Sequence, residues 1–145
     1  MLIKECMTQD VCTIGPDQTI REAARAMAER DIGFIPVEEA DRMVGMITDR
    51  DIAIRALAQG KGPDTKVRDV MTREVRYCYD DEKVDDVLAN MGDLQVRRLP
   101  VVNRDKRLVG IVSLSDCATK ERAQPAANAL DRITRKGGEH SQSLH

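Results

Sequence analysis

The chain has 145 residues, of which 41% are hydrophobic and 33% charged, while only 2% are aromatic; this composition predicts a globular protein whose core is built from Val, Ile, Leu, Met and Ala. The net charge is -2 and no long run of Lys or Arg residues occurs, so the electrostatic signature of a nucleic-acid-binding protein is absent. Because the sequence also lacks a long apolar stretch and the apolar core of a signal peptide, we expect no membrane segment and a cytoplasmic location.

The first predicted element is a short strand over residues 11–14, which ends where Gly and Pro follow. Apolar residues then recur at helical spacing over residues 20–27. Two brief apolar runs, residues 34–37 and 43–47, are joined by polar residues and predict a hairpin. The spacing becomes helical again over residues 52–57. The order strand, helix, strand, strand, helix predicts a unit of mixed α and β structure (α/β in the broad sense), more specifically of the α+β class.

The same order of elements occurs a second time, because residues 7–51 recur as residues 71–116. An offset of 64 residues aligns the paired Met-Thr and Pro-Val sequences, and an offset of 65 aligns the residues beyond them; the extra residue lies in the second hairpin turn, where insertions are tolerated. The predicted division is residues 1–58 for the first repeat, 59–69 for a linker rich in Gly and Pro, 70–122 for the second repeat, and 123–145 for a C-terminal helix over 125–135 and a disordered tail.

Each hairpin contains a proline, Pro36 in the first copy and Pro100 in the second. Proline has no backbone N–H, so it suits the edge or the end of a strand better than a central ladder. Two interpretations follow from its repetition. Either the sheet opens locally at this position, or both prolines merely terminate edge strands.

Histidine and cysteine limit the chemistry available to the body of the chain. Both histidines, His140 and His145, lie in the predicted tail, so Ser-His-Asp and Cys-His nucleophile pairs, the usual zinc sites and histidine general bases are excluded elsewhere. The four cysteines form no Cys-x-x-Cys pair and are predicted to be reduced thiols, mostly small core residues. For Cys117, which directly follows a candidate site, a redox role is the alternative.

Each copy closes with the sequence Gly-x-x-Thr/Ser-x-x-Asp at a strand-to-helix junction. Thr48 with Asp51, and Ser113 with Asp116, have the spacing of a capping box, which would satisfy free helix amides without any ligand. The same helix terminus and hydroxyl could instead bind a phosphate. A carboxylate repels phosphate but accepts two hydrogen bonds from the vicinal hydroxyls of a ribose. The functional interpretation is therefore a nucleotide site.

The two Met-Thr entries, the helices, the Pro-Val hairpins and the two closing turns together resemble a tandem pair of cystathionine β-synthase (CBS) domains. The resemblance covers residues 4 to about 122, with its motifs repeated in register. It implies two repeats related by a pseudo-twofold axis, two clefts that bind adenine nucleotides in many relatives, and a disc-like homodimer.

By position, the resemblance places Thr48 and Ser113 near phosphate or ribose, and Asp51 and Asp116 near the ribose hydroxyls. The base pocket would be lined by first-strand and hairpin residues, namely Cys12, Thr13, Ile35, Pro36, Arg76, Tyr77, Arg98, Leu99 and Pro100.

The two candidate sites are not expected to be equal. The family's Thr-apolar-x-Pro pattern stands at Thr13 in the first copy, but Tyr77 occupies the equivalent position in the second, where it could stack on a base or block the cleft. The first turn carries the additional acid Asp49, whereas Arg97 and Arg98 lie near the second turn. Coulomb attraction therefore favours phosphate in the second cleft, unless these arginines are solvated or paired at the surface.

Three functions are compatible with these features. The first is a non-catalytic regulatory sensor that binds AMP, ADP, ATP or NAD and acts in trans on an unidentified effector protein, without a required cofactor or metal. The second is a ligand-free structural or stress-related dimer in which the turns are only helix caps. The third is a nucleotide-processing enzyme that uses the turn carboxylates; it is disfavoured because histidine is missing and because two equivalent pockets suit binding better than chemistry.

Overall fold

The structure is a computed structural model that describes residues 1–117 and 123–134. The chain forms two compact units: the first unit is Cys12–Val75, and the second unit combines Met1–Val11 with the chain from Arg76 onward. The compact units thus differ from the sequence repeats, because the segment that leads into each copy belongs to the unit of the other copy. The repeat boundaries given above stay a prediction.

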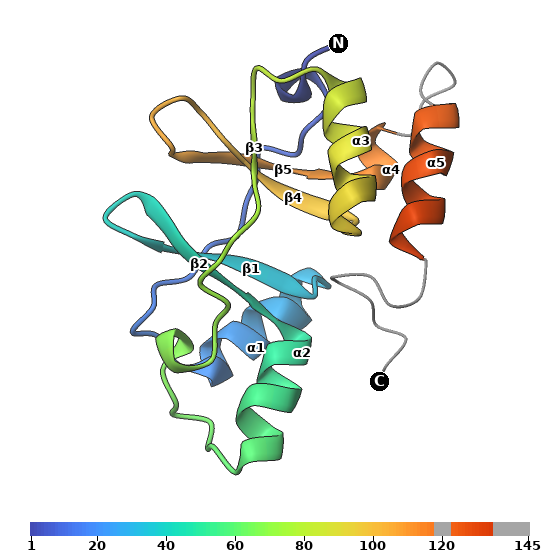
Figure 1. The fold of residues 1–145 in the computed structure, drawn as a ribbon. Helices are drawn as coiled ribbons and strands as arrows, with labels where there is room; N and C mark the ends of the chain where they lie inside the picture. Colours follow the sequence, from blue (N-terminus) through green and yellow to red (C-terminus); the bar gives the residue numbers. More distant parts are fainter. Residues whose placement is uncertain (118–122, 135–145) are drawn as a thin grey trace. The chain divides into compact units, whose positions relative to one another are not determined.

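The first unit is a helix, a hairpin and a second helical segment (Figure 1). Thr19 caps the first helix, since its hydroxyl accepts a hydrogen bond from the Glu22 N–H at 3.2 Å. The helical segment after the hairpin begins as α-helix and continues as a π-helical and then a 3-10 turn. The elements are α1 (Ile20–Arg30), β1 (Phe34–Glu39), β2 (Arg42–Thr48), α2 (Asp49–Asp51), η2 (Ile52–Ala56), η3 (Leu57–Gln59) and η4 (Val67–Asp69).

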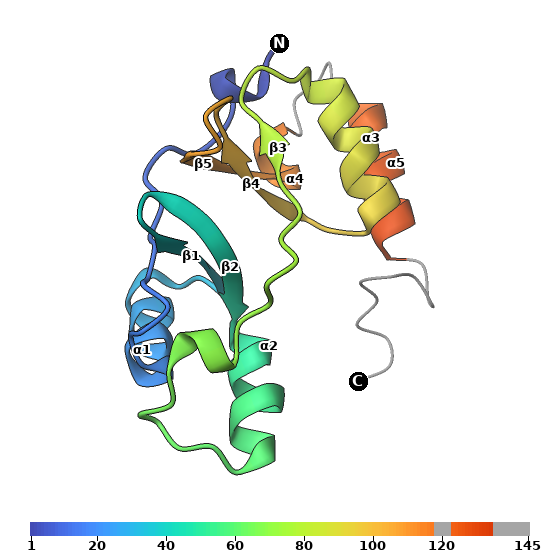
Figure 2. The same ribbon diagram turned by 60° about the vertical axis from the view of Figure 1, so that its left-hand side comes forward.

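The second unit repeats this plan and adds a helix. Figures 1 and 2 show α3 and α5 side by side, and Gly92 allows their close approach, because a Cβ there would lie 3.2 Å from the Ala129 Cα. An ion pair joins Arg132 of α5 to Asp93 of α3. The elements are η1 (Ile3–Glu5), β3 (Cys78–Tyr79), α3 (Val84–Leu94), β4 (Arg98–Val102), β5 (Leu108–Ser113), α4 (Leu114–Cys117) and α5 (Ala123–Ile133).

The α+β class, both hairpins and the helix of each copy are confirmed. The predicted strand over residues 11–14 is wrong in extent, because only Ile14 pairs, through a single parallel bridge to Val37. The terminal helix starts two residues earlier than predicted, at Ala123. The predicted disordered tail and both histidines lie outside the described residues.

The segment that leads into each copy completes the sheet of the unit to which it belongs. Thr72 exchanges two backbone hydrogen bonds with Met46 of β2, at 2.8 and 2.9 Å. Thr8 exchanges the same two bonds with Ile111 of β5, also at 2.8 and 2.9 Å. A glycine precedes each of these positions in the hairpin and makes room for the incoming Met-Thr segment.

The prolines lie inside strands, so the interpretation that they terminate edge strands is wrong. Pro36 pairs with Met46 and Pro100 with Ile111. Met46 and Ile111 direct their own N–H and C=O groups away from the proline, to Thr72 and Thr8. These are therefore non-hydrogen-bonded pairs, in which the missing proline N–H costs the hairpin nothing.

Each unit has its own hydrophobic core, built from aliphatic side chains, Met and Cys, as the low aromatic content predicts. Ile35 and Ile47 are fully buried in the first unit, and Leu88 and Met91 in the second. Among the described residues no polar or charged side chain is buried. The polar side chains of the described residues are therefore all at least partly accessible to solvent.

Candidate functional site

The closing turn of the first unit is a complete capping box. The Thr48 hydroxyl accepts a hydrogen bond from the Asp51 N–H, and Asp51 Oδ2 accepts one from the Thr48 N–H, both at 3.0 Å. The Asp49 N–H donates to the Gly33 carbonyl at 2.9 Å and ties the helix start to the residue before β1. The capping interpretation is thus confirmed as geometry for this turn.

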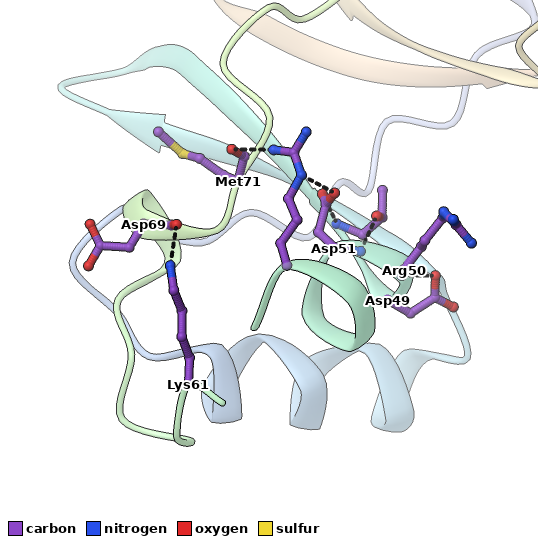
Figure 3. A network of polar contacts seen from close by, with 8 residues as sticks. Asp49, Arg50, Asp51, Lys61, Asp69 and Met71 are labelled. Carbon is purple, nitrogen blue, oxygen red and sulfur yellow. Dashed lines mark hydrogen bonds and ion pairs between the residues drawn. The ribbon is translucent and has the colours of Figure 1, made fainter. Parts of the chain in front are cut away.

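The carboxylate of this turn also faces a basic side chain. Arg55 Nε lies 3.7 Å from Asp51 Oδ1, and Arg55 Nη1 donates to the Met71 carbonyl at 3.4 Å (Figure 3). The Asp51 side chain is only 12% exposed, whereas that of Arg55 is 55% exposed. The guanidinium therefore connects the turn to the segment that leads into the second copy.

Beside this contact lies an open hollow of about 580 Å³. Three of its lining residues are arginines and two are acidic, which leaves a formal charge of +1 on its wall. Arg68 forms ion pairs with Asp17 at 2.8 Å and with Glu39 at 3.2 Å. Arg55 and Arg73 are therefore the lining arginines whose side chains can reorient more easily. The lining consists of Arg55, Arg68, Asp69, Met71, Thr72, Arg73 and Glu74.

The closing turn of the second unit has the same cap but different surroundings. Asp116 donates its N–H to the Ser113 hydroxyl at 3.2 Å, and its Oδ2 accepts from the Ser113 N–H at 3.1 Å. Ser115 shares a further hydroxyl–hydroxyl hydrogen bond with Ser113 at 2.9 Å. The Leu114 N–H donates to the Arg97 carbonyl at 2.8 Å. Asp116 is exposed, in contrast to Asp51.

The remaining predicted site residues divide between the two units. Ile35 and Leu99 are 0% and 1% exposed and belong to the cores. Thr13 is exposed, and the next residue, Ile14, donates its N–H to the Pro36 carbonyl at 3.2 Å. This brings the segment before α1 beside the proline of β1. A pocket role for these residues stays a prediction.

In the second unit, Pro100 is buried and Arg98 is exposed. Tyr77, which precedes β3, packs edge-on against Tyr79 with ring centroids 5.7 Å apart. The Arg104 guanidinium lies 4.0 Å from the centre of the Tyr79 ring, which is a cation–π distance. The two tyrosines therefore form an aromatic group at the position where the first copy has Thr13.

The residues around the hollow were missed at the sequence level. Arg55 follows Asp51 by four positions, a spacing that could have indicated the ion pair. Met71, Thr72 and Arg73 carry no such signal, because only the fold brings the incoming segment beside the helix. Local pattern therefore identified the turn but not its neighbours.

The described part of the chain, residues 1–117 and 123–134, contains no group of three or more His, Cys, Asp or Glu side chains that could hold a metal ion. In the same residues, no helix is long and apolar enough to cross a membrane.

Comparison with known proteins places these features in a family. The CBS domain model matches residues 3–57 and again 67–122. The CBS domain-containing protein YhcV of Bacillus subtilis (strain 168) is 41% identical over 133 residues, which are 91% of this chain and 94% of that protein.

Two solved structures are similar over most of the chain. Hypoxic Response Protein I, crystallised with two coordinated zinc ions, has a TM-score of 0.73 and 37% identity, and the match covers 81% of this chain and 97% of that one. The CBS domain pair of protein MJ0100, in complex with 5'-methylthioadenosine and S-adenosyl-L-methionine, has a TM-score of 0.72 and 32% identity, over 86% of this chain and 98% of that one. With its two closing turns and its two matched segments, the chain belongs to the CBS-domain family as a tandem CBS pair.

Proposed function

We propose that this protein is a regulatory module that binds an adenine nucleotide or a related adenosine compound and acts in trans on an effector protein. The observation that carries the proposal is the Thr48–Asp51 turn, whose carboxylate is linked through Arg55 to an open hollow of about 580 Å³. A similar CBS pair, that of protein MJ0100, is known in complex with methylthioadenosine and S-adenosylmethionine. AMP, ADP, ATP and NAD are further candidates.

The proposed roles follow from the chemistry of each group. The Thr48 hydroxyl, which acts as the acceptor in the cap, would donate its own hydrogen to a phosphate or to a ribose oxygen. Asp51 would accept hydrogen bonds from the ribose hydroxyls, since a carboxylate keeps acceptor capacity beyond the one bond that it makes to the Thr48 N–H. Arg55 would reduce the electrostatic repulsion between a bound phosphate and the carboxylates of Asp51 and Asp49.

The alternative of a ligand-free structural dimer keeps the same caps and needs no hollow. The open hollow, with three arginines in its lining, supports the binding function instead, because helix capping alone does not require such a hollow. A nucleotide-processing enzyme is disfavoured: no histidine lies in the described residues, and YhcV, which matches this chain over 94% of its length, is itself a CBS domain-containing protein.

The decisive experiment is thermal unfolding and calorimetry with AMP, ADP, ATP, NAD and S-adenosylmethionine. A ligand at 100 times its dissociation constant adds about 2.7 kcal/mol to the free energy of unfolding, which raises the melting temperature by several degrees. We expect at least one compound to do so. No shift with any compound would favour the structural dimer, and product formation would favour the enzyme.

Substitutions then distinguish the two turns. We expect Asp51→Ala and Asp116→Ala to weaken binding by clearly different factors, because their charge environments differ; equal losses would contradict unequal sites. Asp51→Asn removes the charge but keeps an acceptor for the Thr48 N–H, so it separates ligand binding from capping. Thr19→Ala is the matched control, since it removes a helix cap away from the proposed site.

We also infer that a second copy of the chain covers the apolar side of the helical segment α2–η3. Ile54 is 47% exposed and Leu57 is 74% exposed there. The two side chains are three positions apart on one helical segment, and neighbouring exposed apolar side chains that form a patch are typical of interfaces. Light scattering should show a dimer for the unmodified chain and a monomer for Leu57→Lys, with Ala58→Lys on the same helical segment as the control.

A further inference from the structure

Two cysteines of the second unit meet although they lie far apart in the sequence. Cys6 Sγ and Cys117 Sγ are 3.7 Å apart, across 111 positions of the chain. Cys6 follows η1, and Cys117 lies in α4, one residue after Asp116. Both side chains belong to or pack against the same hydrophobic core. The contact is therefore held by the fold and not by a mobile segment.

The environments of the thiols differ. Cys117 and Cys78 are each 1% exposed, and burial raises the pKa of both thiols to about 12. Both are therefore neutral near pH 7. Cys6 is only half-buried, so a small water-borne oxidant reaches Cys6 first. Cys117 is then the thiol placed to react next, because it is already in van der Waals contact with Cys6.

We propose that Cys6 and Cys117 form an intramolecular disulfide when the protein meets a peroxide. The Cys6 sulfur attacks one oxygen of hydrogen peroxide, the O–O bond breaks, and the other oxygen leaves as water with the thiol proton, so that Cys6 becomes a sulfenic acid. Cys117 Sγ then attacks the Cys6 sulfur, the S–O bond breaks as the S–S bond forms, and the hydroxyl leaves as a second water with the Cys117 proton. The peroxide is reduced and two thiols are oxidised, so atoms and electrons balance. The sulfurs must approach to about 2.05 Å.

The bond would fasten two parts of the second unit. It would join η1, next to the Thr8 segment that pairs with β5, to the helix that starts at the Ser113 cap. A link across a loop of this length restricts the unfolded chain more than the folded one. The oxidised protein should therefore melt several degrees above the reduced protein, and a thiol reductant should reverse the change.

The test treats the full chain with hydrogen peroxide at a few equivalents and maps the tryptic peptides without reduction. We expect loss of two free thiols, a Cys6–Cys117 peptide and no covalent dimer. Cys6→Ser and Cys117→Ser should each abolish the cross-link. Cys12→Ser, in the other unit, is the matched control and should leave the cross-link unchanged.

Other products would overturn the proposal. A Cys6–Cys78 peptide would show that distance in the folded core does not select the partner. Accumulation of sulfinic acid on Cys6, an intermolecular disulfide, or unchanged thiols under conditions that oxidise free glutathione would each do the same. Circular dichroism of Cys117→Ser, compared with the conservative Cys117→Ala, establishes that the variants are folded when they fail to cross-link.

Discussion

The two closing turns share their local geometry and differ in what surrounds them. Thr48 with Asp51, and Ser113 with Asp116, make the same reciprocal hydrogen bonds. Asp51 pairs with Arg55 four residues on and its side chain is 12% exposed, whereas Asp116 is exposed. The cap is therefore a property of the repeated sequence, whereas the charge around it also depends on residues that the duplication did not keep, such as Asp49, which has Leu114 as its equivalent. Function can diverge at this level without any change in fold.

The largest expected effect tests how far the two units are equivalent. A Cβ on Gly45 would lie 2.9 Å from the Thr72 carbonyl oxygen, and a Cβ on Gly110 would lie 2.9 Å from the Thr8 carbonyl oxygen. Because a backbone atom cannot move aside cheaply, we expect Gly45→Ala and Gly110→Ala each to lower the free energy of unfolding by about 1–3 kcal/mol. Urea unfolding measures this change.

Gly62→Ala is the control for these variants, because nothing lies within 4 Å of a Cβ there. It should be nearly neutral. A marked difference between Gly45→Ala and Gly110→Ala would mean that the two incoming segments do not contribute equally to their units.

A smaller effect is expected from removing the caps. Thr48→Ala and Ser113→Ala should each cost about 1 kcal/mol, since each leaves a helix N–H without its side-chain acceptor. Thr48→Ser keeps the acceptor and should restore most of the loss. If thermal unfolding showed Ser113→Ala to be harmless, the Ser115 hydroxyl, which lies 2.9 Å from that of Ser113, would have taken over the cap.

The smallest effect concerns the equivalent acids Asp17 and Asp81, which have different partners. A hydrogen bond from Arg68 lowers the pKa of Asp17, and one from Arg104 lowers the pKa of Asp81, in each case from the ordinary 3.8. A lowered carboxyl pKa stabilises the folded state above pH 3.8, and this contribution is lost as the pH falls through the lowered value. These exposed pairs are weak and sensitive to salt.

An NMR titration of the aspartate carboxyl carbons measures this directly. Arg68→Ala should return the pKa of Asp17 toward 3.8 and leave Asp81 unchanged, and Arg104→Ala should do the reverse. Movement of both carboxyls in either variant would show that the two pairs are not independent.

Much of the fold could be predicted because its signals are local. Hairpins over residues 34–47 and 98–112 followed from paired apolar runs, and the structure confirms them. The strand β1 continues two residues beyond its predicted end, and β2 has one additional residue at each end. The first strand of each copy could not be predicted well. Ile14 forms one bridge only. This pairing depends on the position of β1 in the folded unit, and the sequence around Ile14 does not indicate it.

The sequence by itself determined the duplication, the helix and hairpin of each copy, and the two capped turns, because each of these depends on residues within a few positions of one another. Tertiary structure decided which unit receives each Met-Thr segment, that Arg68 and not a hairpin residue pairs with Asp17, that Arg55 meets Met71, and that Cys6 meets Cys117. These contacts join distant parts of the chain. Only the packing of complete helices and strands brings such residues together, so no local sequence pattern could predict these contacts.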